Sequence, residues 1–323
     1  MKMNKAGLIL RGMGMGIAEV IPGVSGGTIA FITGIYHPLL ESIKAVDADL
    51  IKSLLRGKFA YAFNKINAAF LLFVLLGMFA GLVSGVFFIS HFLETAPELV
   101  WGVFFSFILA SIPLMIKSMN AFAVTHLIYF IVAALLAFYI TGLTPVTASE
   151  NLLYVFFGGM LAIVALVLPG ISGSFILLLL GLYTLIIPTL KSFLSQPNME
   201  DFKLVAVFGT GCILGLLLFA RLISAAFQRY HDSTIAVMSG FMLGSLNKIW
   251  PWRNPELLLN KESGETVPYS PDLNLDGEIY KLVVEKNVWP GDYIADPRTL
   301  GVLVAGGLVV LVIVIMAKKA PKI

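Results

Sequence analysis

Apolar residues in this chain fall into long runs that contain no charged side chain. The interval between Lys117 and Glu150 holds 32 uncharged residues, and the interval between Lys65 and Glu94 holds 28. A membrane-spanning helix needs about 20 mostly apolar residues. The pattern therefore predicts six membrane-spanning helices, at about 68–92, 98–116, 121–140, 204–227, 233–249 and 299–317.

Two other apolar stretches, 7–37 and 151–187, are each interrupted by a Pro-Gly tip. The first tip is PGVSGG at 22–27, and the second is PGISGS at 169–174. Proline and glycine both disfavour a continuous helix, so a break is expected at each tip. The arm from Ser25 to Tyr36 would be roughly 18 Å long, which is short of a hydrocarbon core of about 30 Å. We interpret both stretches as re-entrant helical hairpins whose tips are buried in protein or face water.

The same unit occurs twice along the chain. A shift of 147 residues superposes the two tips, and a shift of 138 then aligns Gly77 with Gly215 and Gly102 with Gly240. Each copy holds one hairpin and three spans, which predicts repeats at 1–141 and 150–323. The second repeat carries a polar insert at 250–298, expected to be an extracytoplasmic loop or small cap. Glycines spaced four apart, at 12 and 16, at 77, 81 and 85, and at 211 and 215, predict close helix packing.

Basic residues set the expected orientation. With re-entrant hairpins, 14 Lys and Arg fall in segments 1–11, 41–67, 117–120, 221–231 and 318–323. These segments are then cytoplasmic, as are both termini. Three spans per repeat is an odd number, so the second repeat is inverted. The predicted fold is an all-α polytopic membrane protein with two inverted repeats, an arrangement typical of transporters with a site at the repeat interface.

Composition supports this class and excludes others. Hydrophobic residues make up 58% and charged residues 13%, far from the balance of soluble domains. The single Cys212 excludes an internal disulfide framework. The net charge of +3 is spread along the chain, so no nucleic-acid partner is expected. There is no metal-ligand spacing, nucleotide signature or nucleophile-and-base motif, so we expect no metal, no cofactor and no enzyme activity.

The tips and a few intramembrane charges carry the candidate chemistry. A helix N-terminus attracts anions because its first N–H groups lack intrahelical partners, and Ser25 and Ser172 are suitable N-caps. Two such ends, with Arg11, Arg221 and Glu19, sum to about +2, which suits a phosphate monoester. The predicted phosphate-binding residues are Gly23, Val24, Ser25, Gly26, Gly27, Thr28, Gly170, Ile171, Ser172, Gly173, Ser174, Arg11 and Arg221.

Glu19 is the predicted coupling residue, since it is the only carboxylate deep in a hairpin. Its protonation would change the charge of the site by one, and sodium could take the same role as the proton. Three simpler interpretations remain open. The glycines would only permit tight turns, the arginines would extend to the membrane interface, and Glu19 would make a structural hydrogen bond.

The segments GMGMGIAEVIPGVSGGTIAF (12–31) and LVLPGISGS (166–174) resemble the PopT family of bacterial polyprenyl-phosphate transporters. The resemblance implies a flippase that moves undecaprenyl phosphate from the outer to the inner leaflet of the bacterial cytoplasmic (inner) membrane, where the lipid carrier is reused in cell-wall biogenesis. The resemblance implies a functional role for residues 22–28 and 169–174. It assigns no role to Arg11, Arg221 or the insert.

Two other functions stay open at this point. One is an ion-coupled transporter of a small organic anion, which predicts a site closed to lipid. The other is an intramembrane lipid-phosphate enzyme, which predicts a nucleophile or a metal cluster.

Overall fold

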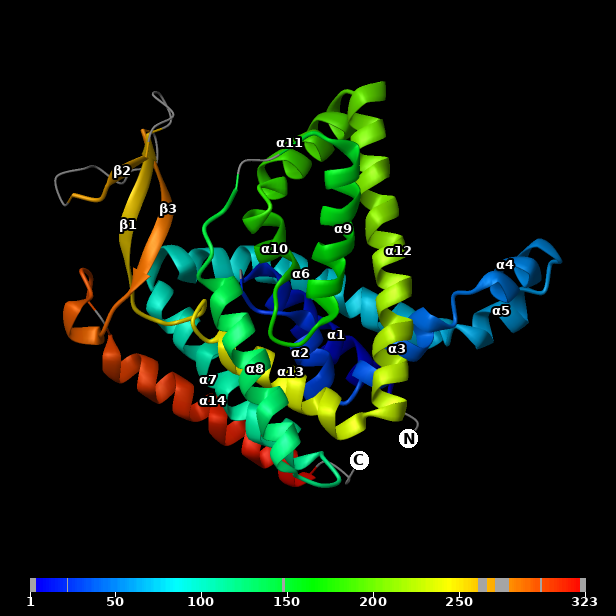
Figure 1. Cartoon of the computed structure of the whole chain (residues 1–323), viewed down its shortest axis with the longest axis horizontal. Helices are drawn as coiled ribbons and strands as arrows, with labels where there is room; N and C mark the ends of the chain where they lie inside the picture. Colours follow the sequence, from blue (N-terminus) through cyan, green and yellow to red (C-terminus); the bar gives the residue numbers. More distant parts are fainter. Residues whose placement is uncertain are drawn as a thin grey trace.

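The computed structural model describes residues 4–21, 23–146, 149–260, 266–270, 279–296 and 298–319. Most of them are helical (Figure 1). The first half contains α1 (Lys5–Val20), α2 (Gly26–Ile32), α3 (Tyr36–Lys44), α4 (Ala48–Leu55), α5 (Phe59–Lys65), α6 (Ala68–Thr95), α7 (Pro97–Lys117) and α8 (Val124–Thr141). The second half contains α9 (Leu152–Val167), α10 (Gly173–Leu179), α11 (Leu182–Ser195), α12 (Met199–Arg229), α13 (His231–Ser245), β1 (Arg253–Asn260), β2 (Thr266–Pro268), β3 (Tyr280–Asn287), the 3-10 turn η1 (Pro290–Asp292) and α14 (Thr299–Lys319).

Within the described residues, four helices are long and apolar enough to cross a membrane alone. They are α6, α7, α8 and α12, which correspond to the spans predicted at 68–92, 98–116, 121–140 and 204–227. The predicted span at 233–249 corresponds to α13, a helix of 15 residues. The span predicted at 299–317 corresponds to α14. The chain is therefore a multi-pass helical membrane protein.

Both predicted hairpins are broken at their tips. α1 and α9 have 16 residues each, and α2 and α10 have seven. Leu152 and Gly173, which begin α9 and α10, follow Lys5 and Gly26 by 147 residues. We expected a helical arm of 12 residues from Ser25 to Tyr36, but α2 is shorter. The chain turns at Gly34 (φ +74°), and a new helix, α3, begins at Tyr36. α10 and α11 form a pair bent by 105°.

Four helix pairs form the body of the molecule: α1 with α6, α9 with α12, α8 with α13, and α7 with α14. Glycines lie at the close approaches. A Cβ on Gly12 or Gly16 would collide with the backbone of α6, and one on Gly211 would collide with the carbonyl of Phe156 on α9. The glycine spacing therefore did predict close helix packing.

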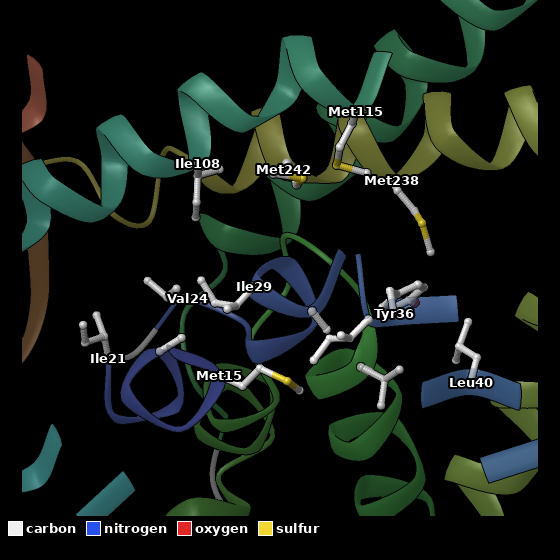
Figure 2. Packing of buried hydrophobic residues seen from close by; sticks show 14 of the residues in the cluster. Met15, Ile21, Val24, Ile29, Tyr36, Leu40, Ile108, Met115, Met238 and Met242 are labelled. Atoms are coloured by element: carbon white, nitrogen blue, oxygen red, sulfur yellow. The ribbon is translucent and has the colours of Figure 1, made fainter. Parts of the chain in front are cut away.

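The main hydrophobic core lies where the first hairpin meets α3, α7 and α13. Figure 2 shows Val24, Ile29 and Met15 of the first hairpin lying beneath α7 and α13. Ile108 of α7 and Met242 of α13 are fully buried above them. The first tip is therefore held inside the protein, as broken backbone at membrane depth requires.

The insert expected to be a polar loop or cap contains a three-stranded antiparallel sheet in the order β2-β1-β3. Residues 261–265, 271–278 and 297 lie outside the described residues. The indole N–H of Trp250 donates to the carbonyl of Val288 (2.8 Å), and its ring meets Phe105 of α7 edge-on. The start of the insert is therefore attached to α7 through Trp250, which also holds the chain at Val288. In Figure 1 the sheet lies at the left, and the helical pair α4–α5 projects on the opposite side.

Candidate functional site

The first tip turns sharply between α1 and α2. Gly23 adopts φ +91°, a backbone conformation that glycine takes readily. Ser25 is the N-cap of α2, and its hydroxyl oxygen accepts a hydrogen bond from the N–H of Gly27 (3.0 Å). Ser25, Gly26, Gly27 and Thr28 are all buried. Pro22, the first residue of the motif, lies outside the described residues.

The second tip repeats this turn with a different set of contacts. Gly170 has φ +92°, and Ser172 is the N-cap of α10. The Ser172 hydroxyl accepts from the N–H of Phe175 (3.4 Å) and lies 2.9 Å from the hydroxyl of Ser174. Ile171 and Ser174 are half-buried, and Gly173 is buried. The second tip therefore has two hydroxyl groups in contact with each other, whereas the first-tip hydroxyls of Ser25 and Thr28 bind the other hairpin.

The two tips contact each other directly. The Ser25 hydroxyl lies 2.9 Å from the carbonyl oxygen of Leu166 and 3.0 Å from that of Leu168, to which it donates. In return, the N–H of Gly170 donates to the hydroxyl oxygen of Thr28 (3.0 Å). Gly27 lies against the carbonyl of Val167, where a Cβ would not fit. The first tip thus contacts the second hairpin through Ser25, Gly27 and Thr28, in a junction between the two hairpins.

Glu19 lies at the same junction. Its carboxylate oxygen Oε1 accepts a hydrogen bond from the N–H of Gly26 (2.8 Å), the first residue of α2. A carboxyl group of the protein itself therefore holds the N-terminus of that helix. At the second tip, the residue 147 positions after Glu19 is Leu166, so α10 has no equivalent carboxylate.

The two predicted arginines lie on α12 and α1. Arg221 of α12 donates from Nη2 to the carbonyl oxygen of Val46 (2.7 Å) and from Nη1 to that of Leu217 (3.2 Å). Neither carbonyl belongs to a tip. Arg11 is half-buried on α1, about 12 Å of helical rise from Glu19. The structure therefore directs the Arg221 side chain to backbone carbonyls outside the tips.

A cation that sequence reasoning missed lies beside both tips. A Cβ on Gly23 would lie 3.2 Å from Cγ of Lys248, and the Lys248 ammonium lies 4.9 Å from the ring centre of Phe175. In the sequence, Lys248 only marks the end of an uncharged run. The available signal was its place two residues before the aromatic segment 250–252.

The described residues contain no group of three or more His, Cys, Asp or Glu side chains that could hold a metal ion. The polar groups at the tips are hydroxyls, backbone N–H groups, one carboxylate and one ammonium. This set can bind an anion and exchange a proton.

The fold and the site define a multi-pass membrane protein built around two broken helices that meet at their tips. Residues 15–267 match the family described as undecaprenyl phosphate translocase-like, and the chain belongs to this family. This confirms the resemblance carried by 12–31 and 166–174. The family and the relatives described next are transporters, so the chain is a transporter and not an enzyme.

Two curated relatives are each named polyprenyl-phosphate transporter. The one from Vibrio cholerae serotype O1 is 40% identical over 266 residues, which cover 82% of this chain and 84% of the relative. The one from Staphylococcus aureus is 27% identical over 258 residues, covering 75% of this chain and 85% of the relative. No solved structure matches the chain.

Proposed function

We propose that this protein is a flippase that moves undecaprenyl phosphate from the outer to the inner leaflet of the bacterial cytoplasmic membrane, and so returns the carrier to cell-envelope synthesis. Family membership and the names of both relatives support a polyprenyl phosphate as cargo. The observation that carries the proposal is the direct contact of two polar tips, through Ser25 and Thr28, inside an otherwise apolar helical body.

The cargo's chemistry explains why a small polar junction is sufficient. An undecaprenyl tail has about 55 carbons, and exposing it to water would cost roughly 40 kcal/mol at about 0.8 kcal/mol per methylene. The tail therefore stays in lipid while the phosphate passes the tips. The hydroxyls of Ser172 and Ser174, together with backbone N–H groups, are suitable donors to phosphate oxygens.

Two inverted repeats would let one site open to each side in turn. Supporting this, α1–α2 and α9–α10 share their lengths and a constant offset of 147 residues. The pairs α8–α13 and α7–α14 each join one helix from either half. We propose that the hairpins enter from opposite sides, with both termini in the cytoplasm and the insert outside.

Accessible cysteines test this orientation. Lys58 and Ser195 are exposed, so each can be replaced by cysteine in a Cys212→Ser background. An impermeant thiol reagent should label Lys58→Cys only from the cytoplasm and Ser195→Cys only from outside. Labelling of both from one side would exclude the inverted arrangement.

We propose Glu19 as the coupling residue. In the present conformation its carboxylate binds the N–H of Gly26, which an arriving phosphate could displace. Placing two anions together favours protonation of the carboxylate, so a proton would travel with the phosphate. Sodium could serve in the same place by neutralising the carboxylate.

Glu19→Gln tests the coupling without removing the acceptor for Gly26. In liposomes with an imposed pH or sodium gradient, the variant should still exchange undecaprenyl phosphate between leaflets but should not respond to either gradient. A gradient response equal to that of the wild type would place the coupling site elsewhere.

The transport function itself is tested in phosphatidylcholine liposomes that contain only this protein and undecaprenyl phosphate. An impermeant phosphatase reports how fast the inner-leaflet carrier becomes accessible. We expect the protein to make this exchange faster than in protein-free liposomes. Competition by undecaprenyl diphosphate or by a small anion then shows which headgroup the protein prefers. No acceleration by the wild type would refute the proposed function.

A further inference from the structure

We propose that Lys248 is the cation that receives the phosphate group at the tips, and that Arg253 of the insert is its positioning residue. The inference deepens the proposed function, on which it rests, and gives the insert a role that its sequence does not indicate. It follows from where the Lys248 side chain lies, what holds its backbone, and what its ammonium contacts.

The Lys248 side chain reaches from one tip to the other. Its Cβ and Cγ pack against Gly23, at 3.7 and 3.2 Å from the position where a Cβ on that glycine would be. Its ammonium group then lies 4.9 Å from the ring centre of Phe175, the third residue of α10. Phe175 lies in the first turn of α10, so the ammonium lies beside the start of the helix that follows the second tip.

The ammonium is available to an anion. Among the described residues, no carboxylate pairs with Lys248 and no hydrogen bond from its ammonium is found; its contact is with the face of the Phe175 ring. A ring face attracts a cation without neutralising its charge, and an ammonium has three N–H donors. The carboxylate at the junction, Glu19, is instead bonded to Gly26. Lysine is a common phosphate ligand, acting as a point charge.

The insert holds the backbone of Lys248. Arg253, the first residue of β1, donates from Nη1 to the carbonyl oxygen of Lys248 (3.4 Å). The Arg253 side chain is only 9% exposed, forms an ion pair with Glu285 of β3 (2.9 Å) and lies over the ring of Trp101 of α7 (4.2 Å). The strand pair β1–β3 and α7 thereby hold the Arg253 side chain in place, and Arg253 in turn holds the backbone of Lys248. The adjacent Ile249 is fully buried, which leaves the segment little freedom.

Binding of farnesyl phosphate tests the role of Lys248, with farnesol as the uncharged control and the full-length protein in detergent. Lys248→Met keeps the packing on Gly23 and Phe175 but removes the charge. We expect it to weaken farnesyl phosphate binding at least tenfold and to leave farnesol binding unchanged. Lys248→Arg should restore most of the affinity. Lys286→Met, which removes an exposed lysine of β3, should bind as the wild type does.

Arg253 is tested by its dependence on Lys248. Arg253→Met alone should weaken farnesyl phosphate binding about threefold to tenfold and lower the melting temperature. The double variant with Lys248→Met should share the lower melting temperature but bind no more weakly than Lys248→Met alone. A further loss of affinity in the double variant would show that Arg253 does not act through Lys248.

The outcomes separate this inference from the proposed function. If Lys248→Met binds farnesyl phosphate within twofold of the wild type, or if Lys286→Met loses as much affinity, the assignment of Lys248 is wrong while transport stands. If the wild type prefers farnesyl phosphate no more than farnesol, both the assignment and the proposed cargo are wrong.

Discussion

At the first tip the N–H of Gly26 is bonded to Glu19, and the hydroxyls of Ser25 and Thr28 are bonded to the other hairpin. At the second tip, Ser172 is bonded to its own neighbours Ser174 and Phe175, and no carboxylate follows in the place of Glu19. The two tips thus share a backbone turn but differ in their hydrogen-bond partners. The first tip attaches the hairpins to each other, whereas the Ser172 hydroxyl of the second tip is bonded within its own tip.

The largest difference between the tips should come from their positive-φ glycines. A Cβ on Gly170 would lie 2.6 Å from the backbone nitrogen of Met242, whereas one on Gly23 would meet side-chain atoms of Ile249 and Lys248 at 3.1 and 3.2 Å. Either alanine variant incurs about 1–2 kcal/mol for the left-handed conformation. Gly170→Ala should lose about 1–3 kcal/mol more through overpacking.

Melting temperatures of the purified variants in one detergent provide the measurement. We expect Gly170→Ala to melt well below Gly23→Ala, and both to melt below the wild type. Equal melting temperatures would contradict the tighter packing of the second tip against α13.

The next effect distinguishes the two capping serines. Ser25 is fully buried, and its hydroxyl serves Gly27, Leu166 and Leu168. Ser25→Ala should therefore destabilise the protein by about 1–3 kcal/mol, since a cap and a buried hydrogen bond are lost together. Ser172→Ala should cost less than about 1 kcal/mol, because its bond to Phe175 is long and Ser174 is half-buried.

Thermal unfolding of the two serine variants, measured side by side, checks this order. Ser172→Ala should lower the rate of transport in liposomes although its stability changes little, since we place the Ser172 hydroxyl beside the phosphate. A larger loss of stability in Ser172→Ala than in Ser25→Ala would reverse our assignment of the two tips.

The smallest of the three effects concerns the bond between the tips. Thr28→Val is nearly isosteric but removes the acceptor for the N–H of Gly170. We expect a loss of about 1 kcal/mol, toward the lower end of the range for an unsatisfied buried donor. Hydrogen exchange at Gly170, followed by mass spectrometry, should become faster in this variant. Unchanged exchange would mean that the bond contributes nothing to holding the tips together.

Much of the fold follows from local sequence signals. The helices α6, α7, α8 and α12 lie where long runs with few or no charges predicted spans, because a charged side chain inside the membrane is costly. The breaks at both tips follow from proline and glycine. The sheet in the insert was not predicted, since β1 and β3 lie in a polar segment rich in Pro, Asn and Asp.

The site was predicted only in part, for a physical reason. A motif indicates where a helix begins, but the partner of a hydroxyl depends on which segment folds against it. The bonds from Ser25 to Leu166 and Leu168 join residues more than 140 positions apart. Lys248 approaches Gly23 and Phe175 only through the packing of α13. Arg221 donates to backbone carbonyls. The sequence does not show whether an arginine binds such a carbonyl or a ligand.

The repetition of α1–α2 as α9–α10 within one polypeptide has an evolutionary consequence. In a symmetric dimer of two separate, identical chains, every residue is present twice, so any substitution alters both halves. Here a substitution alters one copy alone. Glu19 therefore has Leu166 as its counterpart, and Lys248 has Ala110 at the offset of 138. Covalent fusion of a duplicated unit lets an acid and a base be placed singly around one junction, which a symmetric dimer cannot do.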